Sequence, residues 1–356
     1  MGKIHLYSFS VLLVLQAACS TKGGDEQDAA GDDGGGPDMS PDSDVAQEDE
    51  DEEELAPDMG DDPDSSEDDP PAIDIIPEDA LPEQEDFGGD DMAVAAPDFR
   101  VTGPHEVDSV DSAHETADGC TMTYTHVTPR GVSPDVLLVL AHGMERRREQ
   151  MLEWARHYAS WGIPVAAVDL CHCTLLDTDH EQNGFDMVDL ARFLTDGPVI
   201  YEGHSSGGTA AFVAAANDTG VLAMFGLDAT EMYGVVAGVI DELTVPAYGL
   251  AAEPGVCNFN NNTIELFQAA ALGRVLRITE ADHCDFERPT GPLCTVTCGA
   301  GANVLFTLGE IQAAMLGMST AFLVWQAGID PSGELWWSPG LRWYDELLAW
   351  GIIAEV

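Results

Sequence analysis

Short apolar runs without a polar side chain alternate with helix-like stretches from residue 136 onward. The runs occupy residues 136–140, 163–168, 198–201 and 221–227. Such runs are typical of strands that are covered on both faces, as in a parallel sheet. Between the first two, Met151, Trp154 and Tyr158 fall at helical spacing. Strands that alternate with helices predict an α/β fold, with right-handed crossovers, a mostly parallel central sheet and helices on both faces.

Other segments extend this pattern in both directions. Residues 121–127 alternate in polarity before Pro129 and Gly131, which predicts an antiparallel strand at the edge of the sheet. Further strands are expected over 245–252 and 274–279, and helices over 186–194, 207–216 and 263–271. In sheets of this type the functional site lies at the carboxyl ends of the strands. Residues that directly follow the predicted strands are therefore the candidates.

Residues 203–207 read Gly-His-Ser-Ser-Gly and lie between a predicted strand and a predicted helix. This matches Gly-x-Ser-x-Gly, a sharp turn that exposes a serine at a strained backbone angle. The flanking glycines leave room for the turn, and Gly208 allows the helix to pack closely. Gly- and Ser-rich turns that have no catalytic role can have the same pattern. The strand-turn-helix context nevertheless predicts Ser205 as a nucleophile.

A serine hydroxyl needs a base that removes its proton, and a carboxylate that orients the base. His283 follows the last clear strand and lies C-terminal to the serine, so it is the predicted base. Two carboxylates compete for the third role. Asp228 follows the strand over 221–227, whereas Glu253 follows the strand over 245–252. The sequence favours Asp228 and leaves Glu253 as an alternative.

An acyl-transfer site also needs donors for the oxyanion, and these are usually main-chain amides. We expect them from Ser206, directly after the nucleophile, and from Met144, after the first buried strand. His142, in the same loop, is expected to hold that loop in place. Residues 146–148 are three consecutive arginines. They either attract anionic substrates or pair with local acid, and we expect a solvated helical turn.

Together these segments resemble the chlorophyllase-like branch of the α/β-hydrolase superfamily, whose core is shared by polyester- and cutin-hydrolysing enzymes. The resemblance covers most of residues 136–283, and Ala229 replaces a proline that is usual in the branch. It implies an α/β-hydrolase fold, Ser205 as nucleophile, Asp228 as acid and no cofactor. We therefore predict a serine hydrolase of small or polymeric carboxylic esters. Amide or peptide hydrolysis, or non-catalytic binding at a cell surface, are the alternatives.

Residues 1–19 have the three parts of a secretory signal. Lys3 precedes an apolar run over 9–15, and two alanines precede Cys19. The segment resembles a bacterial lipoprotein signal, although Gln16 stands where that motif has an aliphatic residue. We expect an exported protein that is lipidated at Cys19 and held at the cell envelope or surface, with this anchor as its only membrane contact. Ordinary cleavage and secretion is the alternative.

The formal net charge is -52, and 31 of the 65 acidic residues lie between residues 23 and 99, which contain no lysine or arginine. A segment this acidic and this poor in large apolar residues does not bury enough surface to fold. We therefore expect a disordered acidic linker over 20–99 and a single domain over 100–356. The absence of a basic face argues against nucleic acid as a partner.

Seven cysteines follow Cys19, which in an exported protein predicts up to three disulfides and one cysteine left over. The pairing cannot be read from the sequence, although Cys294 and Cys298 are both near enough to Cys284 to be its partner. Residues 171–173 read Cys-His-Cys, for which a disulfide is favoured over zinc because no second pair has zinc-finger spacing. Residues 311–329 carry no charge. They are expected to form a core helix rather than a membrane span.

Overall fold

The computed structural model describes residues 97–291, 294, 298 and 304–356. The predicted signal over 1–19, the lipidation site Cys19 and the predicted linker up to residue 96 lie outside these residues. Phe99 is already fully buried against the domain, where its ring packs edge-on against Trp161 at 4.8 Å.

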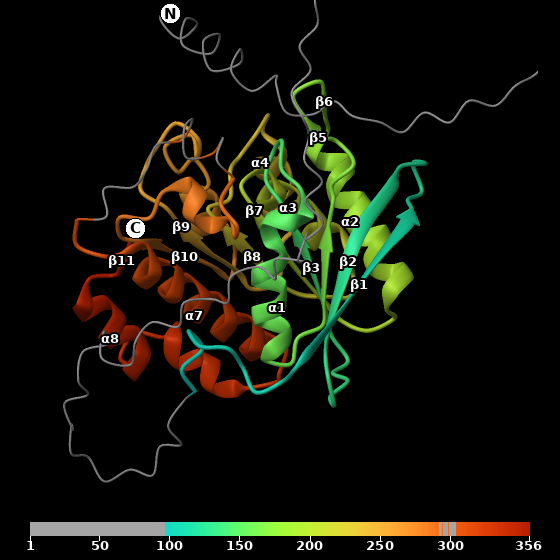
Figure 1. The fold of residues 1–356 in the computed structure, drawn as a ribbon. Helices are drawn as coiled ribbons and strands as arrows, with labels where there is room; N and C mark the ends of the chain where they lie inside the picture. The colour runs from blue at the N-terminus through green and yellow to red at the C-terminus, as the bar shows by residue number, and fades with distance from the viewer. Residues whose placement is uncertain (1–96, 292–293, 295–297, 299–303) are drawn as a thin grey trace, which may run out of the picture. The chain divides into compact units, whose positions relative to one another are not determined.

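A sheet of nine strands lies at the centre of the domain, in the order β1-β2-β4-β3-β7-β8-β9-β10-β11 (Figure 1). The strands are β1 Val107–Glu115, β2 Thr121–Pro129, β3 Leu137–Ala141, β4 Val165–Val168, β7 Val199–His204, β8 Val221–Leu227, β9 Ala247–Ala251, β10 Gly273–Ile278 and β11 Ile353–Glu355. β4, β3, β7, β8, β9 and β10 are parallel to their neighbours in that series. The mostly parallel sheet of an α/β fold is thus confirmed.

The edge of the sheet differs from the prediction. β2 was expected at the edge, but it pairs with β4 on one side and with β1 on the other, both antiparallel. β1 reads Val-Asp-Ser-Val-Asp-Ser-Ala-His-Glu and is exposed over most of its length. An edge strand that buries little surface needs no apolar pattern, so its sequence gives little signal. β11 closes the opposite edge, antiparallel to β10.

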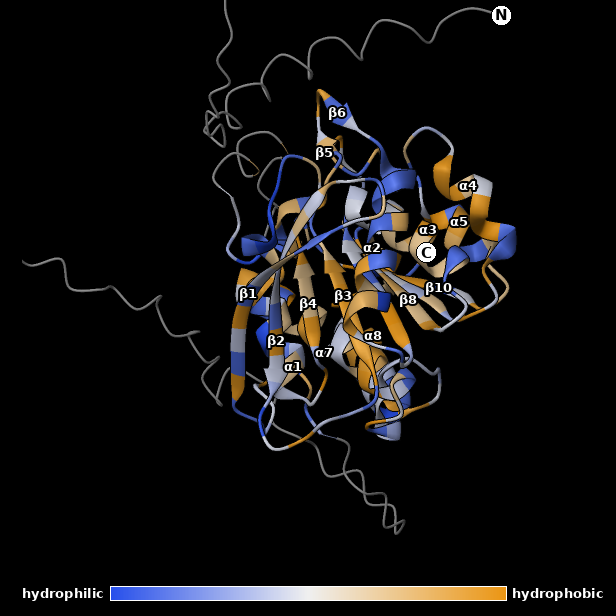
Figure 2. Cartoon of the chain, turned by 90° about the vertical axis from the view of Figure 1, so that its right-hand side faces the viewer, coloured by the Kyte–Doolittle hydropathy of each residue, from blue (hydrophilic) through white to orange (hydrophobic). Residues whose placement is uncertain are grey.

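Helices cover both faces of the sheet. The longer helices are α1 Leu152–Ser160, α2 His180–Leu194, α3 Ser206–Asn217, α7 Leu308–Gln326 and α8 Arg342–Trp350; the short ones are α4 Val235–Val239 and α5 Ile264–Ala269. α1, α7 and α8 pack in one apolar core. α2, α3, α4 and α5 pack in a second core on the other face. Figure 2 shows the apolar central strands between these layers.

α7 is the helix that the uncharged stretch predicted. Among the described helices it alone is long and apolar enough to cross a membrane, and 72% of its apolar window is buried inside the domain. Phe322 of this helix stacks on Tyr248 of β9 with ring centroids 4.8 Å apart. The tryptophans that follow it, Trp336 and Trp337, are fully buried in the same core. In this domain α7 is therefore a core helix.

Three disulfides join loops of the domain: Cys120–Cys171, Cys257–Cys298 and Cys284–Cys294. Cys284, whose partner the sequence left open, is bonded to the nearer of the two neighbouring cysteines. Cys173 is the buried free cysteine of the described residues. Because Cys171 is bonded to Cys120, it is not a ligand in a Cys-His-Cys zinc site.

Candidate active site

Ser205 lies at the turn between β7 and α3, with φ 55° and ψ −123°. A positive φ is uncommon for a residue with a side chain and signals backbone strain. Hydrogen bonds hold the turn on both sides: the Ser205 N–H donates to Leu227 O at 3.1 Å, and Ser205 O accepts from Gly208 N at 2.9 Å and from Thr230 N at 3.1 Å. The strained conformation is therefore fixed by its neighbours on α3 and after β8.

The glycines of the turn are required by close backbone approach. A Cβ on Gly203 would lie 2.1 Å from Gly207 O, and one on Gly207 would lie 2.4 Å from His142 O. Gly208 has Ala229 against it, 2.4 Å from the position of a Cβ. These distances are shorter than any van der Waals contact, so the turn as built excludes side chains at all three positions.

Ser205, His283 and Asp228 form a continuous hydrogen-bonded series. His283 Nε2 lies 2.9 Å from Ser205 Oγ, and His283 Nδ1 lies 2.6 Å from Asp228 Oδ2. The three side chains follow β7, β10 and β8, so the carboxyl ends of these parallel strands bring them together. Ser205 and His283 are 8% and 9% exposed, whereas Asp228 is 2% exposed. Solvent therefore reaches the serine end of the series and not the carboxylate end.

Asp228 is held by groups that the sequence did not single out. Its Oδ1 accepts a hydrogen bond from Ala252 N at 2.9 Å, and buried Asn258 donates from Nδ2 to Oδ2 at 3.1 Å. The same amide nitrogen lies 2.9 Å from Glu253 O. The Glu253 side chain instead accepts from Glu280 N at 3.2 Å and lies 3.7 Å from Arg277. Of the two candidate acids, the structure brings only Asp228 to His283.

His204, the second residue of the motif, supports the backbone of the base. Its Nε2 donates to His283 O at 3.0 Å, and its ring lies 4.6 Å from that of His283. Burial lowers the pKa of His204 well below its usual range, and the nearby His283 lowers it further. A neutral ring with a proton on Nε2 can make this bond. His204 thus helps to hold the backbone of His283 in place.

The two expected oxyanion donors belong to segments that meet at Ser205. Ser206 begins α3, and the first amides of a helix have no acceptor within it. Met144 belongs to the loop after β3, which passes so near the nucleophile that a Cβ on Gly143 would lie 3.0 Å from Ser205 Cβ. His142 secures this loop, because its Nδ1 lies 2.7 Å from Gly143 O and its Nε2 accepts from Leu170 N at 3.1 Å.

The arginines at 146–148 do not form the expected solvated turn. Arg146 lies 2.6 Å from the buried carboxylate of Glu287, and Arg148 pairs with Asp169. Arg147 alone is exposed. Pairing with local acid was the alternative, and the acids come from loops that are distant in sequence, which explains why composition did not reveal them.

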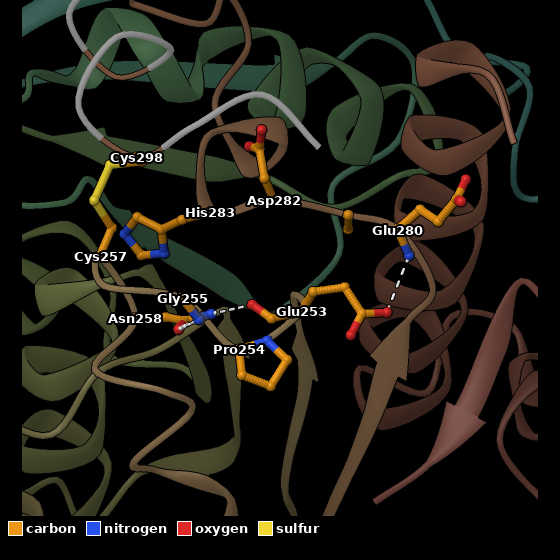
Figure 3. A pocket seen from close by; sticks show the side chains of 10 residues that line it. Glu253, Pro254, Gly255, Cys257, Asn258, Glu280, Asp282, His283 and Cys298 are labelled. Carbon is orange, nitrogen blue, oxygen red and sulfur yellow. Dashed lines mark hydrogen bonds between the residues drawn. A yellow bond between two sulfur atoms is a disulfide. The ribbon is translucent and has the colours of Figure 1, made fainter. Parts of the chain in front are cut away.

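A pocket of about 360 Å³ borders the base. Its walls come from the loop after β9 and from the segment around His283, and the Cys257–Cys298 disulfide closes one side (Figure 3). Ser205 is not among the described residues that line this pocket. Both His283 and Asn258, the residue that holds Asp228, line this pocket.

No family model matches the chain, and no curated protein matches it. Asn258 and Glu287 are the site residues that sequence reasoning missed. The one local signal for Asn258 is its position next to Cys257, since a disulfide fixes the loop on which it lies. For holding a metal ion, a separate group of described residues stands out: Asp118, His172 and Asp186.

Proposed function

We propose that this protein is a serine hydrolase that cleaves carboxylic esters through an acyl-enzyme intermediate. The observation that carries the proposal is the series from Ser205 through His283 to Asp228, which starts at a strained turn between a strand and a helix. A structural serine in a turn requires no base within 2.9 Å of its hydroxyl. It also requires no buried carboxylate on the far side of that base.

In the first half of the reaction, Ser205 Oγ attacks the carbonyl carbon while its proton passes to His283 Nε2. Asp228 accepts a hydrogen bond from His283 Nδ1 and stabilises the imidazolium that forms. The developing oxyanion lies against the N–H groups of Met144 and Ser206. The bond to the alcohol oxygen then breaks, and Nε2 returns the proton to that oxygen.

In the second half, a water molecule gives a proton to His283 Nε2 and attacks the acyl carbon. The tetrahedral intermediate uses the same two amides, and its collapse breaks the bond to Ser205 Oγ, which takes the proton back. Every step is supplied by side chains and amides of this chain. No cofactor is required for it.

The same arrangement supports membership of the α/β-hydrolase superfamily, near its chlorophyllase-like and polyester-hydrolysing branches. The elbow between β7 and α3, an acid after β8 and a base after β10 are the features that agree with that fold. The substrate class is small or polymeric esters. A similar fold is evidence for the core and the triad, and it is much weaker evidence for the chemistry of a substrate pocket.

For its location, we propose export and attachment to the cell envelope through a lipid on Cys19, with the acidic linker between the anchor and the domain. Three disulfides are in keeping with an oxidising compartment. Radiolabelled fatty-acid incorporation that is lost in Cys19→Ala tests this, and secretion of the unmodified wild type would contradict it.

The activity is tested with a short p-nitrophenyl ester and with a fluorophosphonate probe. Ser205→Ala should lower kcat by at least about a thousandfold and abolish labelling. Asp228→Asn should lose most activity, whereas Glu253→Gln should keep it. A folded wild type that neither turns over esters of graded acyl length nor reacts with the probe would favour a non-catalytic binding protein.

A further inference from the structure

Asp118, His172 and Asp186 converge at one corner of the domain, although they come from three separate segments. Asp118 lies in the turn between β1 and β2, His172 in the loop after β4, and Asp186 on α2. One oxygen or nitrogen atom from each lies within 4.8 Å of the corresponding atoms of the other two. This is the spacing of groups that share a single small ligand.

Each carboxylate has one oxygen that accepts a hydrogen bond from a neighbouring group outside this cluster. Asp118 Oδ1 accepts from the Thr116 hydroxyl and from Cys120 N at 3.1 Å, while its Oδ2 lies 3.1 Å from His172 Nε2. Asp186 Oδ1 accepts from Gln182 Nε2 at 2.9 Å. The carboxylates are thus oriented by neighbours, as metal ligands are.

The second carboxylate oxygen of Asp186 is the strongest indication that a cation binds at this corner. Asp186 is 1% exposed, and its Oδ2 is buried with no hydrogen-bond partner among the described residues. A buried carboxylate oxygen without a donor is costly, so it binds a proton or a cation. A positive ligand at this corner would remove the cost.

His172 shows the second half of a metal-ligand pattern. Its Nδ1 lies 3.0 Å from Asp177 Oδ1 on the side away from Asp118. Histidines that bind metals through one ring nitrogen commonly donate the other N–H to a carboxylate, which fixes the ring and its tautomer. Nε2 lies 3.1 Å from Asp118 Oδ2, to which it can donate a proton. An ion that binds here would displace that proton and take the lone pair of Nε2.

We propose that Asp118, His172 and Asp186 bind one divalent transition-metal ion of the zinc class. With Zn–N and Zn–O distances of about 2.0–2.2 Å, neighbouring tetrahedral ligands lie roughly 3.3 Å apart, close to the separation of His172 Nε2 and Asp118 Oδ2. The imidazole favours zinc, nickel or cobalt over calcium, which prefers oxygen ligands alone. A water molecule completes the fourth position.

The ion would join three segments at a place where the Cys120–Cys171 disulfide already links two of them. The His172 loop continues into Cys173, whose Sγ lies 3.5 Å from Gly143 O and 3.6 Å from Ser206 Oγ. Metal binding would therefore brace the segment that contacts Gly143, next to Met144, and Ser206. The site itself stands on its own ligands, and its existence does not depend on the proposed esterase activity.

The test uses the full-length protein after EDTA treatment, titrated with zinc chloride by calorimetry and followed by thermal unfolding. The wild type should bind one equivalent tightly and gain thermal stability. His172→Gln and Asp186→Asn should each bind roughly tenfold or more weakly, and Asp177→Asn about 10–100-fold more weakly. Since Asp186→Asn removes a buried charge, its metal-free form should unfold no earlier than the wild type.

His114→Gln is the matched control, because His114 pairs with Asp189 at 3.0 Å nearby and lies outside the proposed ligand set. It should bind zinc like the wild type. Cobalt(II) bound to the wild type should show tetrahedral d–d absorption without a sulfur charge-transfer band. Zinc uptake or stabilisation that is equal in the wild type, His172→Gln and Asp186→Asn would overturn the proposal. It would assign the uptake to scattered acidic residues.

Discussion

Arg146 donates from Nε to Glu287 Oε1 at 2.6 Å, and this ion pair joins the loop after β3 to the segment that follows His283. The two side chains are 12% and 1% exposed. Glu287 also accepts from Gly291 N at 3.2 Å. One ion pair thus connects the segment that carries Met144 with the segment that carries the base.

Removal of either side chain of the Arg146–Glu287 pair should lower the free energy of unfolding. Arg146→Ala leaves a buried carboxylate without its cation, for which a loss of about 3–5 kcal/mol in unfolding free energy is expected. The double variant Arg146→Met, Glu287→Gln should recover most of this loss, because neither charge remains. Urea unfolding measures both, with exposed Arg147→Ala expected to stay within about 0.5 kcal/mol of the wild type. Equal effects of the two single arginine variants would contradict the assignment.

Glu202 makes stability depend on pH. It is fully buried on β7, where it accepts from the Tyr158 hydroxyl at 2.8 Å. Burial raises its pKa from 4.5 to about 8, although the Tyr158 hydrogen bond lowers it. The folded protein therefore keeps a proton that the unfolded chain releases, and the contribution of Glu202 to stability falls as pH rises from about 4.5 to 8.

At pH 8 the free energy of unfolding of Glu202→Gln should accordingly exceed that of the wild type by on the order of a few kcal/mol. Near pH 5 the two free energies of unfolding should be similar. Glu181→Gln, on the exposed side of α2, serves as control. The measurement is denaturant unfolding across this pH range. Parallel curves for the wild type and Glu202→Gln would show that Glu202 ionises alike in both states.

Asn258 is expected to position Asp228 without touching substrate. Asn258→Ala removes the donor 3.1 Å from Asp228 Oδ2. We expect kcat to fall roughly tenfold or more with KM nearly unchanged, and the pH profile of kcat/KM to shift as the base loses its orientation. Asn260→Gly, in the same loop at a positive φ, is the control. If Asn258→Ala lowers the stability but leaves the pH profile unchanged, Asn258 has a packing role only.

Cys173 should be an inert thiol in the folded protein. It is 3% exposed, and burial raises its pKa to about 12, with the hydrogen bond to Ser206 acting in the opposite direction. Iodoacetamide at pH 8 should therefore leave the Cys173 peptide unmodified, and should alkylate it after unfolding in guanidinium, as mass spectrometry would report. Rapid modification under native conditions would mean that the loop over 171–178 opens.

Strong apolar runs were sufficient to predict the central parallel strands, but not the edge strands β1 and β11. β8 occupies the predicted residues, and β3 is displaced from its prediction by one residue. The positions after strand ends likewise predicted which serine, histidine and aspartate would meet, because parallel strands deliver their carboxyl ends to one edge. α2 begins six residues earlier than predicted, at His180, since Asp179 caps it by accepting from Gln182 N at 2.9 Å.

The features that the sequence did not predict depend on tertiary contacts. Asn258 reaches Asp228 across 30 residues, and Arg146 reaches Glu287 across 141, with no local pattern to announce either contact. Cysteine pairing is similar: the partners of Cys120 and Cys257 lie 51 and 41 residues away. β11 is three residues long, too short for any periodicity.

The polar edge strand β1 has a consequence for how the protein behaves at high concentration. It presents nine residues of backbone at the border of a long sheet, where another chain could add a strand. Asp111 and Glu115 are exposed along it, whereas Asp108 is paired with Arg130, so a second copy of β1 would bring like charges together. Repulsion between identical borders should keep molecules apart in a crowded environment and prevent them from stacking into fibrils.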